Sequence, residues 1–273
     1  MENEFEFEEY LRSLSLKESS IKKYLVVFRN IPSFIFDSIE KINRFIADRS
    51  REYNDAVLYF AVIRHYLRMK GKHDWVRAIR YPRIKRIKRS PTYLNLETIY
   101  KILENIPDEN YKIAGYVQLF GGMRSFEVMQ IRRKDINVLD EEAIITIRTA
   151  KRDPYEAIII GTGFRKLKEY LEKHDFRDDD LIFCKKTNSL DEEHLIQTNI
   201  RYYQEAIKTS ARDLGYTFRS HDLKRNLARF LRYEKGLEIE EVKEALHHSQ
   251  IDTTLRYVGK VNKERIVSAL KYV

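Results

Sequence analysis

The chain has 273 residues, enough for one large domain or two smaller ones, and 43% of them are hydrophobic, so it can bury a substantial core. A net charge of +9 favours a polyanionic partner, while the single cysteine, Cys184, excludes an internal disulfide framework and is typical of a reducing cytoplasm. The acidic start lacks the basic segment of a signal peptide, and no uncharged apolar run could span a bilayer, so we expect a cytoplasmic protein.

Residues 1–75 predict a small domain of four amphipathic helices. Apolar side chains recur there at helical spacing in four separate stretches, which begin near Phe5, Ile21, Ile39 and Ala56. Ser19 and Ser20 are the expected cap of the second helix, and Gly71 is expected to follow the fourth. These apolar helix faces by themselves indicate an all-α core and no particular activity.

Residues 76–92 hold a dense run of cations between two domains. Apolar and basic residues alternate from Arg83 to Arg89, which is not the pattern of a buried helix, so we expect an extended linker. Cations this dense repel one another without a counter-charge, which favours contact with the phosphates of a polyanion over a merely solvated segment. The expected phosphate contacts are Arg77, Arg80, Arg83, Lys85, Arg86, Lys88 and Arg89.

Residues 93–273 predict a second domain, which makes the chain mainly α with a small β-sheet. Two β-branched segments, 143–148 and 157–160, flank a turn that carries Lys151 and Arg152 and predict a hairpin. Leu181 to Cys184 predicts another short strand. Helices are expected at 96–106 with Asn95 as its cap, 113–120, 125–132, 163–173, 192–214, from 220 onward, 239–246, 251–257 and 263–272.

Three short segments of this domain gather residue types that suit phosphoryl transfer. They are Gly121 to Arg124, where an arginine follows two glycines, His221 to Lys224 at a helix start, and His247 to Tyr257. The glycines would let the backbone approach a ligand closely. Arginine can neutralise the charge of a phosphodiester, a tyrosine hydroxyl can form a covalent intermediate, and histidines can move protons.

These segments resemble the catalytic core of the tyrosine recombinases, the family of Xer proteins, Cre and phage integrases. The most specific matches are Gly122-Met123-Arg124-Ser125-Phe126-Glu127-Val128, around the family's first catalytic arginine, and Leu246-His247-His248-Ser249, which resembles its Leu-Gly-His-Ser. The resemblance implies a core-binding domain in residues 1–75 and a catalytic domain in 93–273, closing on DNA as a C-shaped clamp. A start directly at the helical bundle favours an Xer-like or Cre-like recombinase over a lambda-type integrase.

The resemblance also implies a role for each site residue. Tyr257 becomes the nucleophile that forms a 3′-phosphotyrosine link, and neither a metal nor another cofactor is implied. The other residues are Arg124, Lys224 and His248 to hold the phosphate, Lys151 to protonate the leaving oxygen, His221 to assist proton movement, Glu127 and Arg225 in support, and Arg152 as a DNA contact. The implied partner is double-stranded DNA with an inverted-repeat site. A homotetramer would bind two duplexes, with a monomer or dimer in the absence of DNA, and the last helix either passes to a neighbour or packs on its own subunit.

Two residues depart from the family pattern. Lys224 occupies the position of the second arginine and loses its bidentate phosphate contact, and Arg225 lies about 100° further around the helix. His247 replaces a glycine and adds bulk. A DNA-binding protein on the same fold with weak or lost cleavage therefore stays open, as does a metal-dependent nuclease, for which Asp178-Asp179-Asp180 is the only dense acidic cluster. Xer-type resolution and mobile-element integration or excision both fit the sequence.

Overall fold

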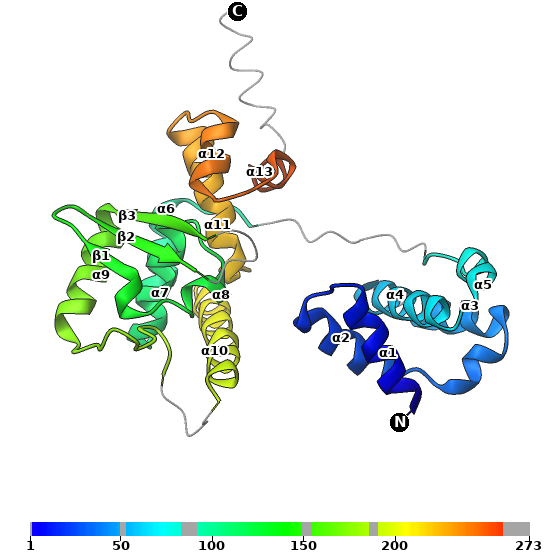
Figure 1. The fold of residues 1–273 in the computed structure, drawn as a ribbon. Helices are drawn as coiled ribbons and strands as arrows, with labels where there is room; N and C mark the ends of the chain where they lie inside the picture. Colours follow the sequence, from blue (N-terminus) through cyan, green and yellow to red (C-terminus); the bar gives the residue numbers. More distant parts are fainter. Residues whose placement is uncertain (1, 50–52, 83–91, 149–153, 186–190, 259–273) are drawn as a thin grey trace, which may run out of the picture. The chain divides into compact units, whose positions relative to one another are not determined.

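The computed structural model describes residues 2–49, 53–82, 92–148, 154–185 and 191–258. The chain divides into two compact units, Met1–Arg89 and Ser90–Val273, each with its own hydrophobic core. Within the described ranges both units are mainly helical, and the strands lie in the second (Figure 1). The predicted fold class, mainly α with a small sheet, is confirmed. None of the helices described is long and apolar enough to cross a membrane.

The first unit is a bundle arranged around one helix. Its elements are α1 (Glu2–Ser13), α2 (Glu18–Arg29), η1 (Ser33–Asp37), α3 (Ile39–Asp48), α4 (Tyr53–Met69) and α5 (His73–Ala78). Helix α4 packs against α1, α2, α3 and α5, and the fully buried Phe7, Ile42 and Ile63 lie in the shared core. The four predicted helices are confirmed, but α2 begins at Glu18, so Ser19 lies inside its first turn and does not cap it.

Helix α5 occupies the start of the segment predicted to be extended. Trp75 and Val76 pack against the core of the first unit and Ile79 is buried in it, which explains why the chain continues as a helix there. Arg77 and Arg80 are exposed. The other predicted linker cations fall in 83–91, outside the described residues.

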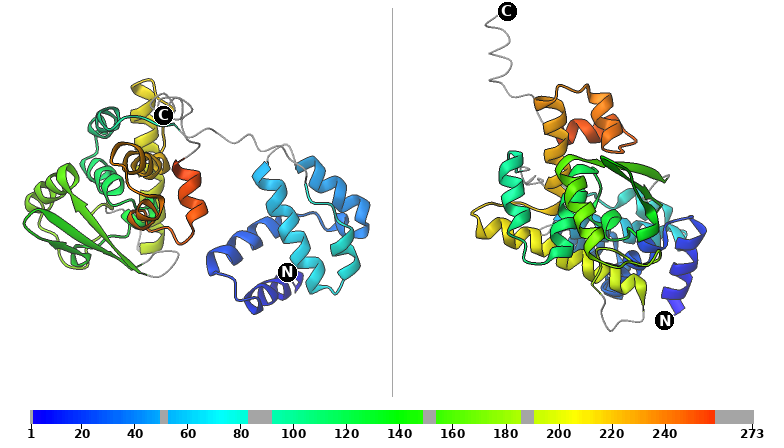
Figure 2. Two further views of the ribbon diagram at one scale, coloured as in Figure 1. Left: turned by 90° about the horizontal axis from the view of Figure 1, so that it is seen from above. Right: turned by 90° about the vertical axis from the view of Figure 1, so that its left-hand side faces the viewer.

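The described part of the second unit combines helices with a three-stranded sheet (Figure 2). Its elements are α6 (Leu96–Glu104), α7 (Glu109–Phe120), α8 (Ser125–Val128), η3 (Arg133–Asp135), β1 (Ile136–Val138), β2 (Glu142–Ile147), β3 (Tyr155–Ile160), α9 (Gly161–Lys173), α10 (Glu192–Asp213), α11 (Ser220–Arg229), the π-helical turn η4 (Phe230–Glu234), α12 (Ile239–Ala245) and α13 (Ile251–Val258). Asn95 caps α6 as predicted, because its side chain accepts the N–H of Thr98 at 2.8 Å. Helix α8 ends at Val128, four residues earlier than expected.

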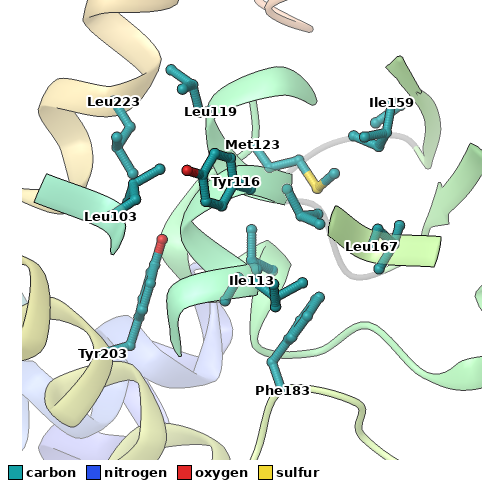
Figure 3. Packing of buried hydrophobic residues seen from close by; sticks show 14 of the residues in the cluster. Leu103, Ile113, Tyr116, Leu119, Met123, Ile159, Leu167, Phe183, Tyr203 and Leu223 are labelled. Carbon is teal, nitrogen blue, oxygen red and sulfur yellow. The ribbon is translucent and has the colours of Figure 1, made fainter. Parts of the chain in front are cut away.

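The strands form an antiparallel sheet in the order β1-β2-β3, which confirms the predicted hairpin and adds β1. Ala143, Ile145 and Ile147 alternate toward the core, where α9 packs on β2 and β3 and the almost wholly buried α7 packs on α9. Figure 3 shows part of this core, with Ile113 and Leu119 of α7, Ile159 of β3 and Leu167 of α9 among the packed side chains. The strand predicted at 181–184 is wrong: within the described chain only an isolated bridge pairs Leu181 with Arg132.

The two glycines before Arg124 lie close to other parts of the protein. The sequence had suggested that they let the backbone approach a ligand. Gly122 has a φ of +58°, and a Cβ there would lie 2.9 Å from the carbonyl oxygen of Ala245 at the end of α12. Only glycine fits this left-handed position and this close contact. The turn therefore presses the segment before Arg124 against the end of α12, next to His247.

Candidate active site

Side chains from distant parts of the second unit converge on Tyr257. This residue lies near the end of α13, which packs against α11 and α12, and only 9% of it is exposed. Its ring lies nearly perpendicular to two imidazoles, His248 at 4.7 Å and His221 at 5.3 Å between ring centroids. The guanidinium of Arg225 lies 5.6 Å from the centre of the same ring. Two histidines and one cation thus surround the predicted nucleophile.

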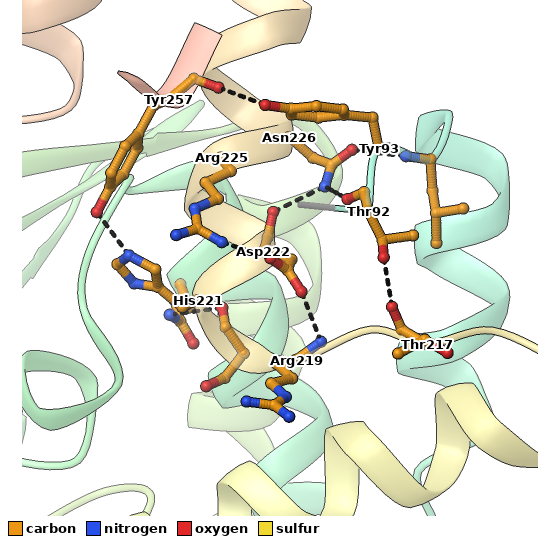
Figure 4. A network of polar contacts seen from close by, with 12 residues as sticks. Thr92, Tyr93, Thr217, Arg219, His221, Asp222, Arg225, Asn226 and Tyr257 are labelled. Carbon is orange, nitrogen blue, oxygen red and sulfur yellow. Dashed lines mark hydrogen bonds and ion pairs between the residues drawn. The ribbon is translucent and has the colours of Figure 1, made fainter. Parts of the chain in front are cut away.

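The phenol of Tyr257 is hydrogen-bonded to His221. Its hydroxyl lies 2.7 Å from Nε2 of His221 (Figure 4). Burial lowers the pKa of His221 to about 4, and the charges of Arg225 and Lys224 act in the same direction, so the imidazole is neutral and Nε2 can accept the phenolic proton. Burial raises the pKa of Tyr257, while Arg124 and Arg225 oppose that rise. The net effect raises the pKa of Tyr257, so the phenol is protonated in this arrangement, and the cations reduce the free-energy cost of forming the phenolate that attack on phosphorus requires.

The start of α11 is fixed by a buried carboxylate. Asp222 accepts the backbone N–H of Arg219 at 3.0 Å and the guanidinium of Arg225 at 3.0 Å. Asn226 donates to the carbonyl oxygens of Thr92 and Asp222, which ties the helix to the segment that enters the second unit (Figure 4). These bonds explain why His221 is held in place and why Arg225 turns toward the Tyr257 ring.

The end of α13 is anchored by residues that sequence reasoning missed. The hydroxyl of Tyr93 donates to the backbone oxygen of Tyr257 at 3.1 Å, and Arg229 donates to that of Val258 at 2.9 Å. The Arg229 guanidinium also lies 4.0 Å from the centre of the Tyr93 ring. No local motif marks these residues, because each contact joins segments far apart in the chain.

His248 is fixed by a partner within its own segment. Its Nδ1 lies 3.0 Å from Oγ1 of Thr254, and both residues are buried. Thr254 is the second residue of the Thr253-Thr254 pair, which precedes Tyr257 in the sequence. A hydrogen bond on one ring nitrogen sets the orientation of the other.

Arg124 is held by Glu127, as the supporting role predicted for this acid requires. The buried carboxylate of Glu127 accepts the backbone N–H of Arg124 at 2.6 Å and its guanidinium at 2.9 Å. Tyr155, at the start of β3, donates its hydroxyl to the same carboxylate at 2.9 Å. The Arg124 side chain keeps 26% of its surface exposed. Arg124 can therefore bind an anion while Glu127 orients it.

Lys224 is a fully buried cation near this pair. Its Nζ has no hydrogen-bond partner among the residues that the structure describes. Burial lowers its pKa to about 7, Arg124 acts in the same direction, and Glu127 opposes the shift. A buried donor without a partner costs free energy, on the order of 1–3 kcal/mol, which an anionic ligand would recover.

Several predicted site residues fall outside the described part of the second unit. Lys151 and Arg152 lie outside the described residues, and Arg77 and Arg80 belong to the first unit. The acidic run from Asp178 to Asp180 makes structural contacts instead, with backbone oxygens accepting from the N–H groups of residues 133 and 134. In the described part of the chain, no three His, Cys, Asp or Glu side chains are grouped as metal ligands would be.

Comparison with known proteins covers most of the chain. The model of the phage integrase family matches residues 92–264. The chain is 25% identical over 271 residues to "Tyrosine recombinase XerA" of Thermococcus kodakarensis, covering 97% of this chain and 92% of that protein. It is 27% identical over 232 residues to the protein of the same name from Thermococcus onnurineus, covering 83% and 78%.

Solved structures share the fold. A lambda integrase dimer bound to a COC′ core site matches with a TM-score of 0.68 and 17% identity, covering 94% of this chain and 96% of that one. XerH bound to a palindromic difH substrate matches with a TM-score of 0.62 and 21% identity, covering 85% and 69%. The chain therefore belongs to the phage integrase family, the tyrosine recombinases, which are enzymes that cleave and rejoin DNA.

Proposed function

We propose that the protein is a site-specific recombinase that cuts duplex DNA through a 3′-phosphotyrosine intermediate. One observation carries this proposal: the hydroxyl of Tyr257 contacts a neutral His221 inside a cluster of cations. Arg124, Lys224 and His248 would hold the scissile phosphate, and the buried Nζ of Lys224 would gain an acceptor there.

The reaction follows from these positions. The oxygen of Tyr257 attacks phosphorus while Nε2 of His221 accepts the phenolic proton, and the bond from phosphorus to the 5′-oxygen breaks. Lys151, placed on the hairpin turn by the sequence, gives the leaving oxygen its proton. A 5′-hydroxyl from a second duplex then attacks the phosphotyrosine, and the proton returns to Tyr257. The phosphodiester energy stays in the tyrosyl link, so the proposed steps use neither ATP nor a metal.

The proposed substrate is double-stranded DNA with an inverted-repeat site. The two units would close on it as a clamp, and a homotetramer would align two duplexes, with residues 263–272 either donated to a neighbour or packed on their own subunit. Solved neighbours include a lambda integrase tetramer bound to a Holliday junction, and the two Thermococcus relatives are named XerA. These likenesses favour Xer-type resolution, with mobile-element integration or excision as the second possibility, in the cytoplasm.

A protein that binds DNA but cleaves it weakly or not at all is the second candidate. The observation that favours it is Lys224, since a lysine cannot clamp a phosphate with two parallel hydrogen bonds. The assay described next distinguishes the two candidates from each other and from a metal-dependent nuclease.

The test uses a randomised library of 5′-labelled duplexes incubated with the full chain in EDTA. Under the proposal, labelled strands remain attached to denatured protein and the released fragments carry 5′-hydroxyl ends. Binding without any adduct would support the second candidate. Nicking that requires added Mg²⁺ and leaves no adduct would contradict both.

A further inference from the structure

His247 has an unusual backbone conformation. Its φ is +53°, and Ser15 is the one other non-glycine residue with a positive φ in the described ranges. The left-handed conformation costs a residue with a Cβ about 1–2 kcal/mol, whereas glycine adopts it freely. A side chain retained at such a position needs a compensating role.

The imidazole of His247 lies on the ring of Tyr155. The ring centroids are 3.9 Å apart and the planes differ by 23°, which is a stacked arrangement. Burial lowers the pKa of His247 to about 4, with Lys224 and Arg124 acting in the same direction, so the ring is neutral. A hydrogen bond to the Gly121 backbone opposes that shift and places the ring beside the turn that leads to Arg124.

Tyr155 links His247 to Arg124 through the carboxylate of Glu127. Its hydroxyl donates at 2.9 Å to the carboxylate oxygen of Glu127 that also accepts the Arg124 backbone N–H, and the other oxygen accepts the Arg124 guanidinium. Tyr155 is also the first residue of β3 and pairs with Ile147 of β2. One aromatic ring therefore connects the hairpin, the phosphate-binding arginine and the segment that carries His248.

We propose that His247 is a positioning residue that holds Tyr155 over Glu127, and so fixes Arg124 and the hairpin in one catalytic geometry. The proposal rests on the function proposed above. It assigns no contact with DNA to His247 or Tyr155. Both act through Glu127 and Arg124, so their loss changes the rate of cleavage more than the affinity for DNA.

Replacing His247 by glycine gives the sharpest test. His247→Gly removes the strain of the positive φ. If the imidazole had no function, this variant would be as stable as wild type or more stable, and it would cleave DNA at the wild-type rate. The proposal predicts a roughly 10- to 100-fold slower formation of the covalent adduct, with DNA affinity changed less than about threefold. His247→Phe keeps a stacking ring and should retain most of the rate, whereas His247→Asn tolerates the backbone but cannot stack and should be slow.

Two control variants test whether relief of backbone strain, or loss of an imidazole, changes the adduct rate anywhere in the protein. Ser15→Gly relieves the same backbone strain in the first unit. His174→Ala removes an imidazole that lies 4.5 Å from the ring of Tyr170 on α9. Both should leave the adduct rate unchanged.

A double-mutant cycle tests whether His247 acts through the hydroxyl group of Tyr155. Tyr155→Phe keeps the ring and loses its bond to Glu127, so it should slow cleavage, and its effect should not add fully to that of His247→Gly. Full additivity, or a wild-type rate for His247→Gly, would overturn the inference while leaving the recombinase proposal intact. An absence of adduct from the wild-type protein would instead remove the proposed function on which it rests.

Discussion

The hydroxyl of Tyr257 lies 2.7 Å from Nε2 of His221, across 36 residues of sequence. Helices α11 and α13 thus bring the proposed nucleophile and its proposed proton acceptor together from distant parts of the sequence. The anchors at the end of α13, Tyr93 and Arg229, hold the backbone that presents the phenol.

The buried Lys224 should make stability depend on pH. Its pKa is about 7 in the folded protein against 10.5 unfolded, so between these values the unfolded chain binds the additional proton and the free energy of unfolding rises with pH. Below about pH 7 both states are protonated, and the cost of the buried charge is fully present. Lys224→Met should be more stable than wild type at about pH 6, by a few kcal/mol as an order of magnitude, and the difference should shrink by about pH 9.

Chemical denaturation of both proteins at the two pH values measures this effect. Equal pH dependence in wild type and Lys224→Met would contradict it. Binding of DNA gives a second readout: if phosphate binds the protonated amine, affinity should fall as pH rises through about 7, and this fall should be absent in Lys224→Met.

Lys224→Arg should speed cleavage. A guanidinium stays charged at all working pH values and can bind a phosphate with two parallel hydrogen bonds, so we expect adduct formation to rise roughly tenfold near neutral pH. Single-turnover rates on one selected duplex measure it. Lys208→Arg, at an exposed lysine of α10 paired with Glu205, serves as the control. A large loss of rate would mean that the buried space around residue 224 is shaped for lysine.

Glu127→Gln should slow cleavage without abolishing DNA binding. The amide keeps the shape of the side chain but loses the charge that orients Arg124, so we expect a roughly 10- to 100-fold lower adduct rate. Glu104→Gln is a matched control, because Glu104 also accepts a tyrosine hydroxyl, from Tyr116, and pairs with a lysine away from this site. Similar losses in both variants would point to a general effect on folding.

The basic linker should contribute to the salt dependence of DNA binding. Neutralising Arg83, Lys85 and Arg86 with glutamine should lower the slope of log affinity against log salt by about 0.9 for each DNA phosphate that these side chains neutralise in the wild type. Binding titrations across a salt series measure that slope. If the slope stays the same, the run is a solvated segment and the protein must hold DNA through other cations.

The local patterns of this sequence predicted its elements well. Asn95 caps α6, and the two β-branched segments form β2 and β3, because capping and alternation depend on neighbours in sequence. The strand predicted at 181–184 is absent from the structure, since a short apolar run can be buried without pairing. Helix α5 was missed because its burial depends on the core of the first unit, which no local pattern reveals.

Candidate site residues that stand in motifs could be proposed from the sequence, whereas residues held by long-range contacts could not. Arg124, His221, His248 and Tyr257 stand in motifs, and all four lie in the second unit. Tyr93 and Tyr155 could not be found, because nothing distinguishes them from the other tyrosines of the chain until the fold brings them to Tyr257 and Glu127. Arg225, which the resemblance gave only a supporting role, lies over the Tyr257 ring.

Identification of the residue that becomes covalently attached to DNA is the decisive test of the proposed mechanism. After reaction in EDTA with a selected duplex, proteolysis and mass spectrometry should find the nucleotide on the peptide that contains Tyr257. Tyr257→Phe should bind the duplex with wild-type affinity and form no adduct. An adduct on another residue, or a normal adduct yield from Tyr257→Phe, would contradict the account.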